Sequence, residues 1–161
     1  RNRLRRPPPR GSGGDRRARG TRVIPGPTVN LLGERAPATY GTDTVDDHVE
    51  RVRAVASRAG VAVDSFLSNS ESEIVSAVQG ARAAHGAIII NAGALTHYSW
   101  ALHDALRACD GPKIEVHISN PGAREGFRHT SVIAPVVNGT IAGFGGLGYD
   151  VAAHTAVALL G

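Results

Sequence analysis

The chain has 161 residues, one cysteine and a formal net charge of +4, and this length suits one domain with a proper hydrophobic core. The lone Cys109 excludes a disulfide framework and a cysteine-based metal cluster. No apolar run approaches the roughly 18 residues of a membrane-spanning helix. The sequence therefore favours a cytoplasmic protein with no membrane partner.

The positive charge is concentrated at the start of the chain. Residues 1–22 hold nine of the 18 lysines and arginines and one acidic residue, a net +8, whereas the other 139 residues carry nine basic and 13 acidic side chains, a net −4. The segment 1–20 is rich in Arg, Pro and Gly and cannot bury apolar surface, which predicts a disordered tail before a folded domain over 21–161. No aromatic residues interleave its arginines, so we favour an extension without a selected role over a nucleic-acid-binding arm.

Apolar periodicity and turn residues predict an alternation of strands and helices along the folded part. Thr44 and Asp47 form a capping-box pattern before valines that recur at helical spacing, and Gly60 ends that helix. In chain order, the expected elements are a strand over 21–25, a long loop over 26–41, a helix between Thr44 and Gly60, a strand over 61–67, a helix over 70–85, a strand over 87–91, a helix over 96–109, strands over 113–119 and 136–144, and a helix over 147–160.

Strands separated by helices predict βαβ units, and hence a parallel sheet with right-handed crossovers. Five strands in this arrangement fit an α/β, flavodoxin-like doubly wound sheet with strand order 2-1-3-4-5. In that order the ends of the first, third and fourth strands surround one crevice. We expect the chemistry of the protein there.

The strand over 113–119 places a histidine just before a polar turn. Imidazole titrates near neutral pH, so His117 is a candidate general acid or base. Glu115 lies two residues earlier on the same face of the strand and is a candidate to orient or charge it. A satisfied core histidine is the alternative interpretation.

The strand over 87–91 delivers a second set of polar groups to the same edge. It ends in Asn91, and His97 follows a turn of small residues. His97 and His117 have no third ligand at a recognisable spacing, so we expect no metal. No Gly-rich phosphate fingerprint is present either, and a cofactor-free acid–base site is the better prediction.

Tyr40 ends the long loop, five residues after Arg35. A nearby guanidinium group favours a phenolate, which can act as a base. Arg35 could supply it, and Arg128 could too if the fold brings it close. From spacing alone, a tyrosine that anchors the loop is the favoured interpretation.

The turn after the fourth strand carries two arginines, Arg124 and Arg128, and the backbone amides of Ile118 and Ser119 open it. Together these groups would hold an anionic, hydroxylated ligand. Asp104, on the helix over 96–109, is either a surface acid or a group that reaches a ligand in a neighbouring subunit.

In order and with similar gaps, these residues resemble the type II 3-dehydroquinate dehydratases over about residues 22–160. The stretches that carry the resemblance are Gly26-Pro27, Asn30-Leu-Leu-Gly-Glu-Arg35, Tyr40-Gly41, Ser68-Asn69, Asn91-Ala-Gly93, Leu95-Thr-His97, Asp104-Ala-Leu106, Ile114-Glu-Val-His-Ile-Ser-Asn120, Arg124-Glu125, Phe127-Arg128 and Gly148-Tyr149.

The resemblance implies a cofactor-free hydro-lyase, assembled as a dodecamer of trimers, that converts 3-dehydroquinate to 3-dehydroshikimate in the shikimate pathway or in quinate breakdown. It implies that Tyr40 removes a proton to give an enolate, that Arg35 assists Tyr40, and that His117 protonates the departing hydroxyl. The loop up to Tyr40 would close as a lid. The implied substrate-binding groups are Asn91, His97, Arg128, the Ile118 and Ser119 amides, and Asp104 from the adjacent subunit.

The chain departs from the family pattern at the end of its first strand and in the turn after its fourth strand. Thr28 stands where the family has an asparagine that helps to stabilise the enolate, while Asn30 is retained; Pro25 and Gly122 replace an asparagine and a histidine. These departures motivate an alternative: a weakly active or non-catalytic relative that binds a similar cyclic acid or serves as an oligomeric scaffold.

Overall fold

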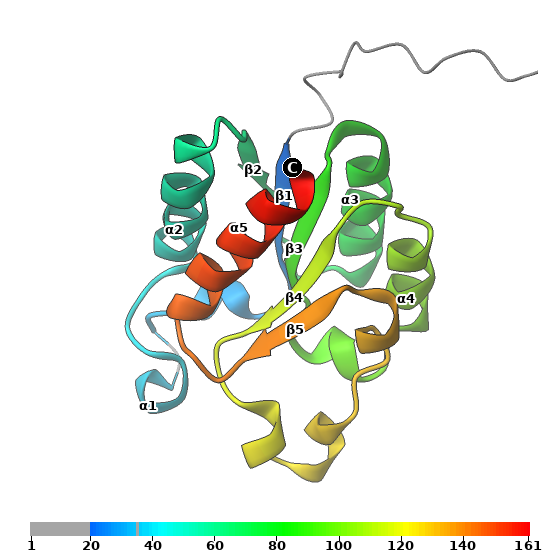
Figure 1. Cartoon of the computed structure of the whole chain (residues 1–161). Coiled ribbons are helices and arrows are strands. Elements are labelled where there is room, and N and C mark those ends of the chain that lie inside the picture. Colours follow the sequence, from blue (N-terminus) through cyan, green and yellow to red (C-terminus); the bar gives the residue numbers. More distant parts are fainter. Residues whose placement is uncertain (1–19, 35) are drawn as a thin grey trace, which may run out of the picture.

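The computed structural model describes residues 20–34 and 36–161 as a parallel sheet between two layers of helices (Figure 1). Residues 1–19 of the predicted tail and the candidate catalytic Arg35 lie outside the described residues.

The sheet has five parallel strands in the order β2-β1-β3-β4-β5, which confirms the predicted topology. The register pairs Pro25 with Asn91 and Ile90 with Glu115, so the carboxyl ends of β1, β3 and β4 meet at one edge, as the crevice prediction requires. The strands are β1 Thr21–Pro25, β2 Val63–Ser65, β3 Ala87–Asn91, β4 Lys113–His117 and β5 Gly139–Ala142.

Helices cover both faces of the sheet, α2 and α5 on one side and α3 and α4 on the other (Figure 1). All of β3 is buried between these layers, as expected for the central strand of a parallel sheet. Among the described residues no helix is long and apolar enough to cross a bilayer. The helices are α1 Pro37–Tyr40, α2 Val45–Arg58, α3 Glu71–Ala84, α4 Trp100–Arg107 and α5 Leu147–Leu160.

Several element boundaries predicted from the sequence are wrong, and the strands expected over 61–67 and 113–119 shorten to Val63–Ser65 and Lys113–His117. The helix expected over 96–109 begins only at Trp100, because the Ser99 side chain accepts a hydrogen bond from the Leu102 N–H and caps α4, while Gly93–His97 form a separate 3₁₀ helix. The strand expected over 136–144 is shorter, since a 3₁₀ turn over Ala134–Val136 precedes it. The 3₁₀ helix matters for the site because it carries His97.

A glycine lets the loop after β1 lie against the end of β3. The Gly26 N–H donates to the Asn91 carbonyl over 2.8 Å, and a Cβ at Gly26 would lie 2.9 Å from that same oxygen. Any larger residue would push the loop away from Asn91. This close approach brings the loop that ends in Tyr40 to the polar edge of the sheet.

One buried histidine, His48 on α2, is packed against α5 with its ring stacked on Tyr149, at 4.9 Å between centroids and 6° between planes. It is 1% exposed, and neither ring nitrogen has a hydrogen-bond partner among the described residues. Burial lowers the pKa of His48 below its ordinary value, although the Asp43 carboxylate opposes this. The charged groups around the ring are Asp43, Asp47, Arg51 and Asp150.

We therefore expect His48 to make the fold sensitive to acid. The unfolded chain protonates this ring near its ordinary pKa of ~6.5, and the folded chain only at lower pH, so the unfolded state holds more protons in between. The contribution of His48 to the free energy of unfolding is therefore complete above the ordinary pKa. It is lost as the pH falls below that value, by up to about 1.4 kcal/mol per pH unit. Urea unfolding between about pH 5 and pH 8 should show a flatter acid limb in His48→Leu than in the wild type; parallel limbs would contradict the expectation.

The loop after β1 holds a non-glycine residue in the left-handed region. Thr28 has φ 65°, and its N–H donates to the Asn69 side-chain oxygen over 2.8 Å. A β-branched side chain is strained there, whereas asparagine adopts this conformation readily.

Replacing this residue by Thr28→Asn should raise the free energy of unfolding by about 1 kcal/mol, because the strain of the branched side chain is relieved. Thr42→Asn is the matched control: Thr42 is exposed and is not among the positive-φ residues of the described chain. Its free energy of unfolding should stay within about 0.5 kcal/mol of the wild type. Denaturant titration measures both, and equal values for the two variants would refute the strain argument.

Candidate active site

A cleft of about 190 Å³ opens at the carboxyl ends of β1, β3 and β4. Its walls come from the loop after β1, the 3₁₀ helix after β3 and the turn after β4. The structure thus brings together, on one cleft, most of the site residues predicted from the sequence. Those that line it are Thr28, Tyr40, Asn91, His97, His117, Ile118, Ser119, Arg124 and Arg128.

His117 is held by a buried carboxylate. Its Nε2 lies 2.6 Å from Glu115 Oε1, and Glu115 is fully buried. The predicted pairing of Glu115 with His117 is therefore present in the structure. Because Nε2 is engaged, Nδ1 is the ring nitrogen left for a ligand in the cleft.

Side chains from other elements donate hydrogen bonds to the buried Glu115 carboxylate in place of water. The hydroxyl of Thr96 donates to Oε1, and that of Thr140 on β5 donates to Oε2 over 3.1 Å. Ser131 lies 2.8 Å from the Thr96 hydroxyl and 3.5 Å from the carboxylate. Burial alone would raise the pKa of Glu115, but the hydrogen bonds from His117 and Thr96 outweigh it and lower that pKa. Glu115 is therefore a charged group under His117.

The cation on Tyr40 in the described part of the chain is Arg124. Its Nη1 donates to the Tyr40 hydroxyl over 2.7 Å and to Ser119 Oγ over 3.1 Å, and its Cζ lies 5.4 Å from the Tyr40 ring centroid. The carbonyl of Arg124 lies 3.0 Å from His129 Nε2. From the sequence, Arg35 and Arg128 are the candidates for a guanidinium beside Tyr40, whereas Arg124 is expected only in the ligand-binding turn.

Arg128 itself is placed on the cleft wall by its own neighbours. Its Nε donates to Glu125 Oε2 over 2.8 Å, and its guanidinium lies over the Phe127 ring, 4.6 Å from the centroid. Arg128 also lines the cleft, where its remaining guanidinium N–H groups can meet an anionic or hydroxylated ligand.

Asn91 and His97 form the wall next to the end of β3. Asn91 accepts from the Gly93 N–H over 3.2 Å through Oδ1 and donates through Nδ2 to the Tyr149 hydroxyl over 3.2 Å. His97 Nδ1 lies 2.7 Å from the Thr130 carbonyl, an acceptor that fixes the proton on Nδ1 and leaves Nε2 for a ligand.

Three expected site residues of the described chain do not line this cleft, and one of them is Glu115, which is buried against His117. Asp104 is exposed on α4, and Asn30 is exposed in the loop after β1. Among the described residues no group of three or more His, Cys, Asp and Glu side chains is arranged to hold a metal ion.

Tyr149 and Thr96, which lie behind the cleft wall and touch Asn91 and Glu115, stand in stretches that carry the family resemblance, but the sequence predicts no role for them. Thr96 directly precedes His97, and Tyr149 directly follows Gly148 at the start of α5. Neither position carries a periodic signal that marks it as more than core.

The sequence of this chain is similar to those of known 3-dehydroquinate dehydratases. The family described as "Dehydroquinase class II" matches residues 20–157. A 3-dehydroquinate dehydratase of Hyphomonas neptunium is 52% identical over 139 residues, which cover 86% of this chain and 93% of that protein. A second such protein, 3-dehydroquinate dehydratase 1 of Corynebacterium efficiens, is 48% identical over 81% of this chain and 86% of its own length.

Solved structures show the same fold. The type II dehydroquinase of Propionibacterium acnes superposes with a TM-score of 0.83 at 38% identity, covering 88% of this chain and 97% of the other. A 3-dehydroquinate dehydratase-like protein of Bifidobacterium longum has a TM-score of 0.66 at 28% identity over the same shares of the two chains. The matched region spans the sheet, both helical layers and every predicted site residue, and the chain belongs to the class II dehydroquinase family.

Proposed function

We propose that this protein is a hydro-lyase that removes water from 3-dehydroquinate to give 3-dehydroshikimate, without a cofactor and through an enolate. The observation that carries the proposal is the pairing, on one cleft, of a tyrosine beside a guanidinium with a histidine on a buried carboxylate. The reaction serves the shikimate pathway or quinate breakdown.

The first step is removal of a proton next to the ketone. The Tyr40 hydroxyl accepts a hydrogen bond from Arg124, and this charged donor stabilises negative charge on the phenol oxygen when it acts as the base. The phenolate takes the proton, and the electron pair left behind forms the enolate. Arg35 assists in the same way, as its place in the family motif implies.

The second step is loss of the hydroxyl. The enolate electrons return to form the carbon–carbon double bond, the C–O bond breaks, and His117 gives its proton to the departing oxygen, which leaves as water. Glu115 binds Nε2 of the ring and so holds the imidazole in place for this transfer from the other ring nitrogen. The proton from the first step remains on Tyr40 and returns to His117 through solvent.

The substrate carboxylate lies at the end of β4 in this proposal. The backbone amides of Ile118 and Ser119 bind it, in a stretch that lines the cleft. Asn91, His97 and Arg128 bind the ring hydroxyls. Thr28 lies on the opposite wall, where its hydroxyl is shorter than the asparagine side chain of the family pattern.

Turnover is tested by the rise of enone absorbance when purified protein meets 3-dehydroquinate. Tyr40→Phe and His117→Asn should each lower kcat by about a hundredfold to ten thousandfold, because each removes one proton-transfer group. His154→Asn, an exposed histidine on α5 away from the cleft, should leave kcat within about twofold. Binding of 3-dehydroquinate without turnover by the wild type would instead favour the non-catalytic alternative.

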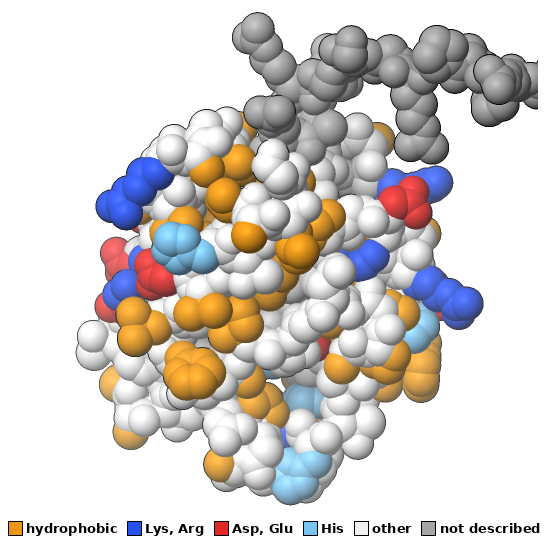
Figure 2. Space-filling view, viewed as in Figure 1, with side chains coloured by type: hydrophobic (Ala, Val, Ile, Leu, Met, Phe, Trp, Pro, Cys, Tyr) orange, Lys and Arg blue, Asp and Glu red, His pale blue; other side chains and the backbone are white. Residues whose placement is uncertain are grey.

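We also propose that the active form is an oligomer, a dodecamer of trimers, in which Asp104 reaches the cleft of a neighbouring subunit. Asp104 is exposed, and Trp100, four residues before it on α4, is 64% exposed, so both lie on one side of the helix. Apolar side chains also gather on the face over α5 and the turn before it (Figure 2). Exposed apolar surface of this kind marks an interaction site.

Subunit mixing tests the position of Asp104. Asp104→Ala should lower kcat/KM by about tenfold to a hundredfold, the loss of one charge-assisted hydrogen bond. Co-expression of the Asp104→Ala chain with the His117→Asn chain should restore part of the activity, because some clefts then combine an intact His117 with an intact Asp104 from the neighbour. If Asp104 acted within its own chain, no mixed oligomer would contain a complete site and activity would stay low.

A further inference from the structure

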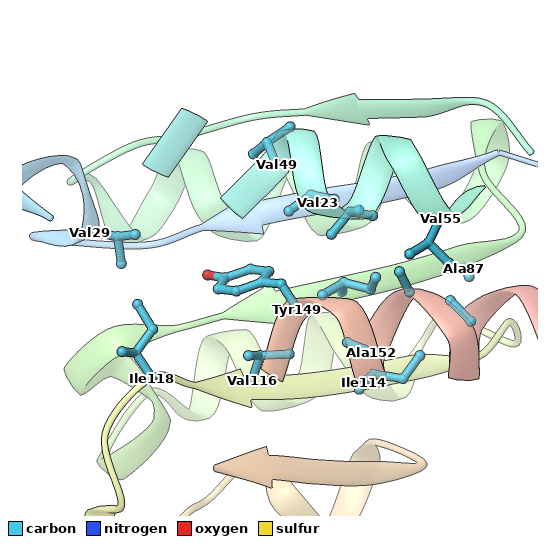
Figure 3. Close-up of a cluster of buried hydrophobic side chains, with 14 of the residues drawn as sticks. Val23, Val29, Val49, Val55, Ala87, Ile114, Val116, Ile118, Tyr149 and Ala152 are labelled. Atoms are coloured by element: carbon cyan, nitrogen blue, oxygen red, sulfur yellow. The ribbon is translucent and has the colours of Figure 1, made fainter. Parts of the chain in front are cut away.

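Tyr149 is a buried phenol that the proposed reaction does not use, yet it touches a residue that the reaction needs. It is fully buried at the start of α5. Its hydroxyl accepts a hydrogen bond from Asn91 Nδ2 over 3.2 Å. In Figure 3 this oxygen points along the sheet toward the end where Val29 and Ile118 lie, and both of those residues line the cleft.

The orientation of the Asn91 amide is fixed from two sides. Its Oδ1 accepts from the Gly93 N–H, and only glycine fits at position 93, because a Cβ there would lie 2.9 Å from the Pro27 carbonyl. With Oδ1 so held, Nδ2 faces Tyr149 and uses one of its two hydrogens there. The second hydrogen is left for a ligand in the cleft that Asn91 lines.

The phenol suits a passive role. Burial raises the pKa of Tyr149 to about 12, although the Asn91 hydrogen bond opposes the shift, so the group stays neutral. Its ring is held flat against His48. The helix that carries Tyr149 starts close to β4: a Cβ added at Gly148 would lie 3.4 Å from a Val116 methyl group.

We propose that Tyr149 is a positioning residue, whose hydroxyl holds the Asn91 amide in the rotamer that presents an N–H to a substrate hydroxyl. Without the hydroxyl, Nδ2 has no acceptor at its back, and the amide is free to turn away from the ligand. This inference rests on the proposed function and extends it to a residue that does not line the cleft.

A double-mutant cycle between Tyr149→Phe and Asn91→Ala tests the proposal. Tyr149→Phe keeps the ring and its stack on His48 but removes the hydroxyl. We expect KM for 3-dehydroquinate to rise about tenfold with kcat within about twofold, as for loss of one oriented hydrogen bond. In the Asn91→Ala background the same change should alter kcat/KM by less than about twofold, because the group it positions is gone.

Thr21→Val is the matched control for loss of a buried hydroxyl. Thr21 is 1% exposed, its Oγ1 has no partner among the described residues, and it lies at the opposite end of β1 from the cleft. Its kinetics should equal those of the wild type. Losses in kcat/KM that multiply across the cycle would overturn the role of Tyr149 while leaving the proposed function intact. Absence of turnover in the wild type would overturn the proposed function, and this inference with it.

Discussion

The buried carboxylate of Glu115 is the constraint on which the site depends. A charge without solvent is very costly unless hydrogen bonds replace the lost water. Here the donors come from separate parts of the chain: His117 on β4, Thr96 after β3, and Thr140 on β5. Because the carboxylate needs these donors together, it ties the 3₁₀ helix, the edge strand and the His117 imidazole into one arrangement. The position of His117 is thus set by the electrostatics of the core.

Two tyrosines of the site differ because their surroundings differ. Tyr40 lies at the cleft, where its hydroxyl accepts a hydrogen bond from the guanidinium of Arg124. Tyr149 lies in the apolar core, where burial raises its pKa to about 12 and keeps it neutral. The same side chain therefore meets a cation at the cleft in one place and an amide in the closed core in the other.

The sequence was sufficient for the parts of the site that sheet geometry dictates. Apolar runs ending in Asn91 and His117, separated by a helical pattern, predict parallel neighbours whose ends meet, and the register bears this out. The alternation of side chains along β4 likewise predicts Glu115 beside His117. Contacts that depend on the path of a loop could not be predicted. Arg124 lies 84 residues from Tyr40, and no local period links the two. Tyr149 and Asn91 are 58 residues apart, and their contact depends on how α5 packs on β3, which no local period predicts either.

Arg124 joins the two kinds of structure that form the cleft. The end of β4 is fixed by its pairing with β3 and β5, whereas Tyr40 comes from a loop whose short helix α1 contains no buried residue. One nitrogen of Arg124 donates hydrogen bonds to both the Tyr40 hydroxyl and Ser119 Oγ. The guanidinium group therefore connects the loop to the turn that follows β4. The same contact places a cation on the phenol, so the position of the loop and the charge beside its tyrosine depend on one side chain.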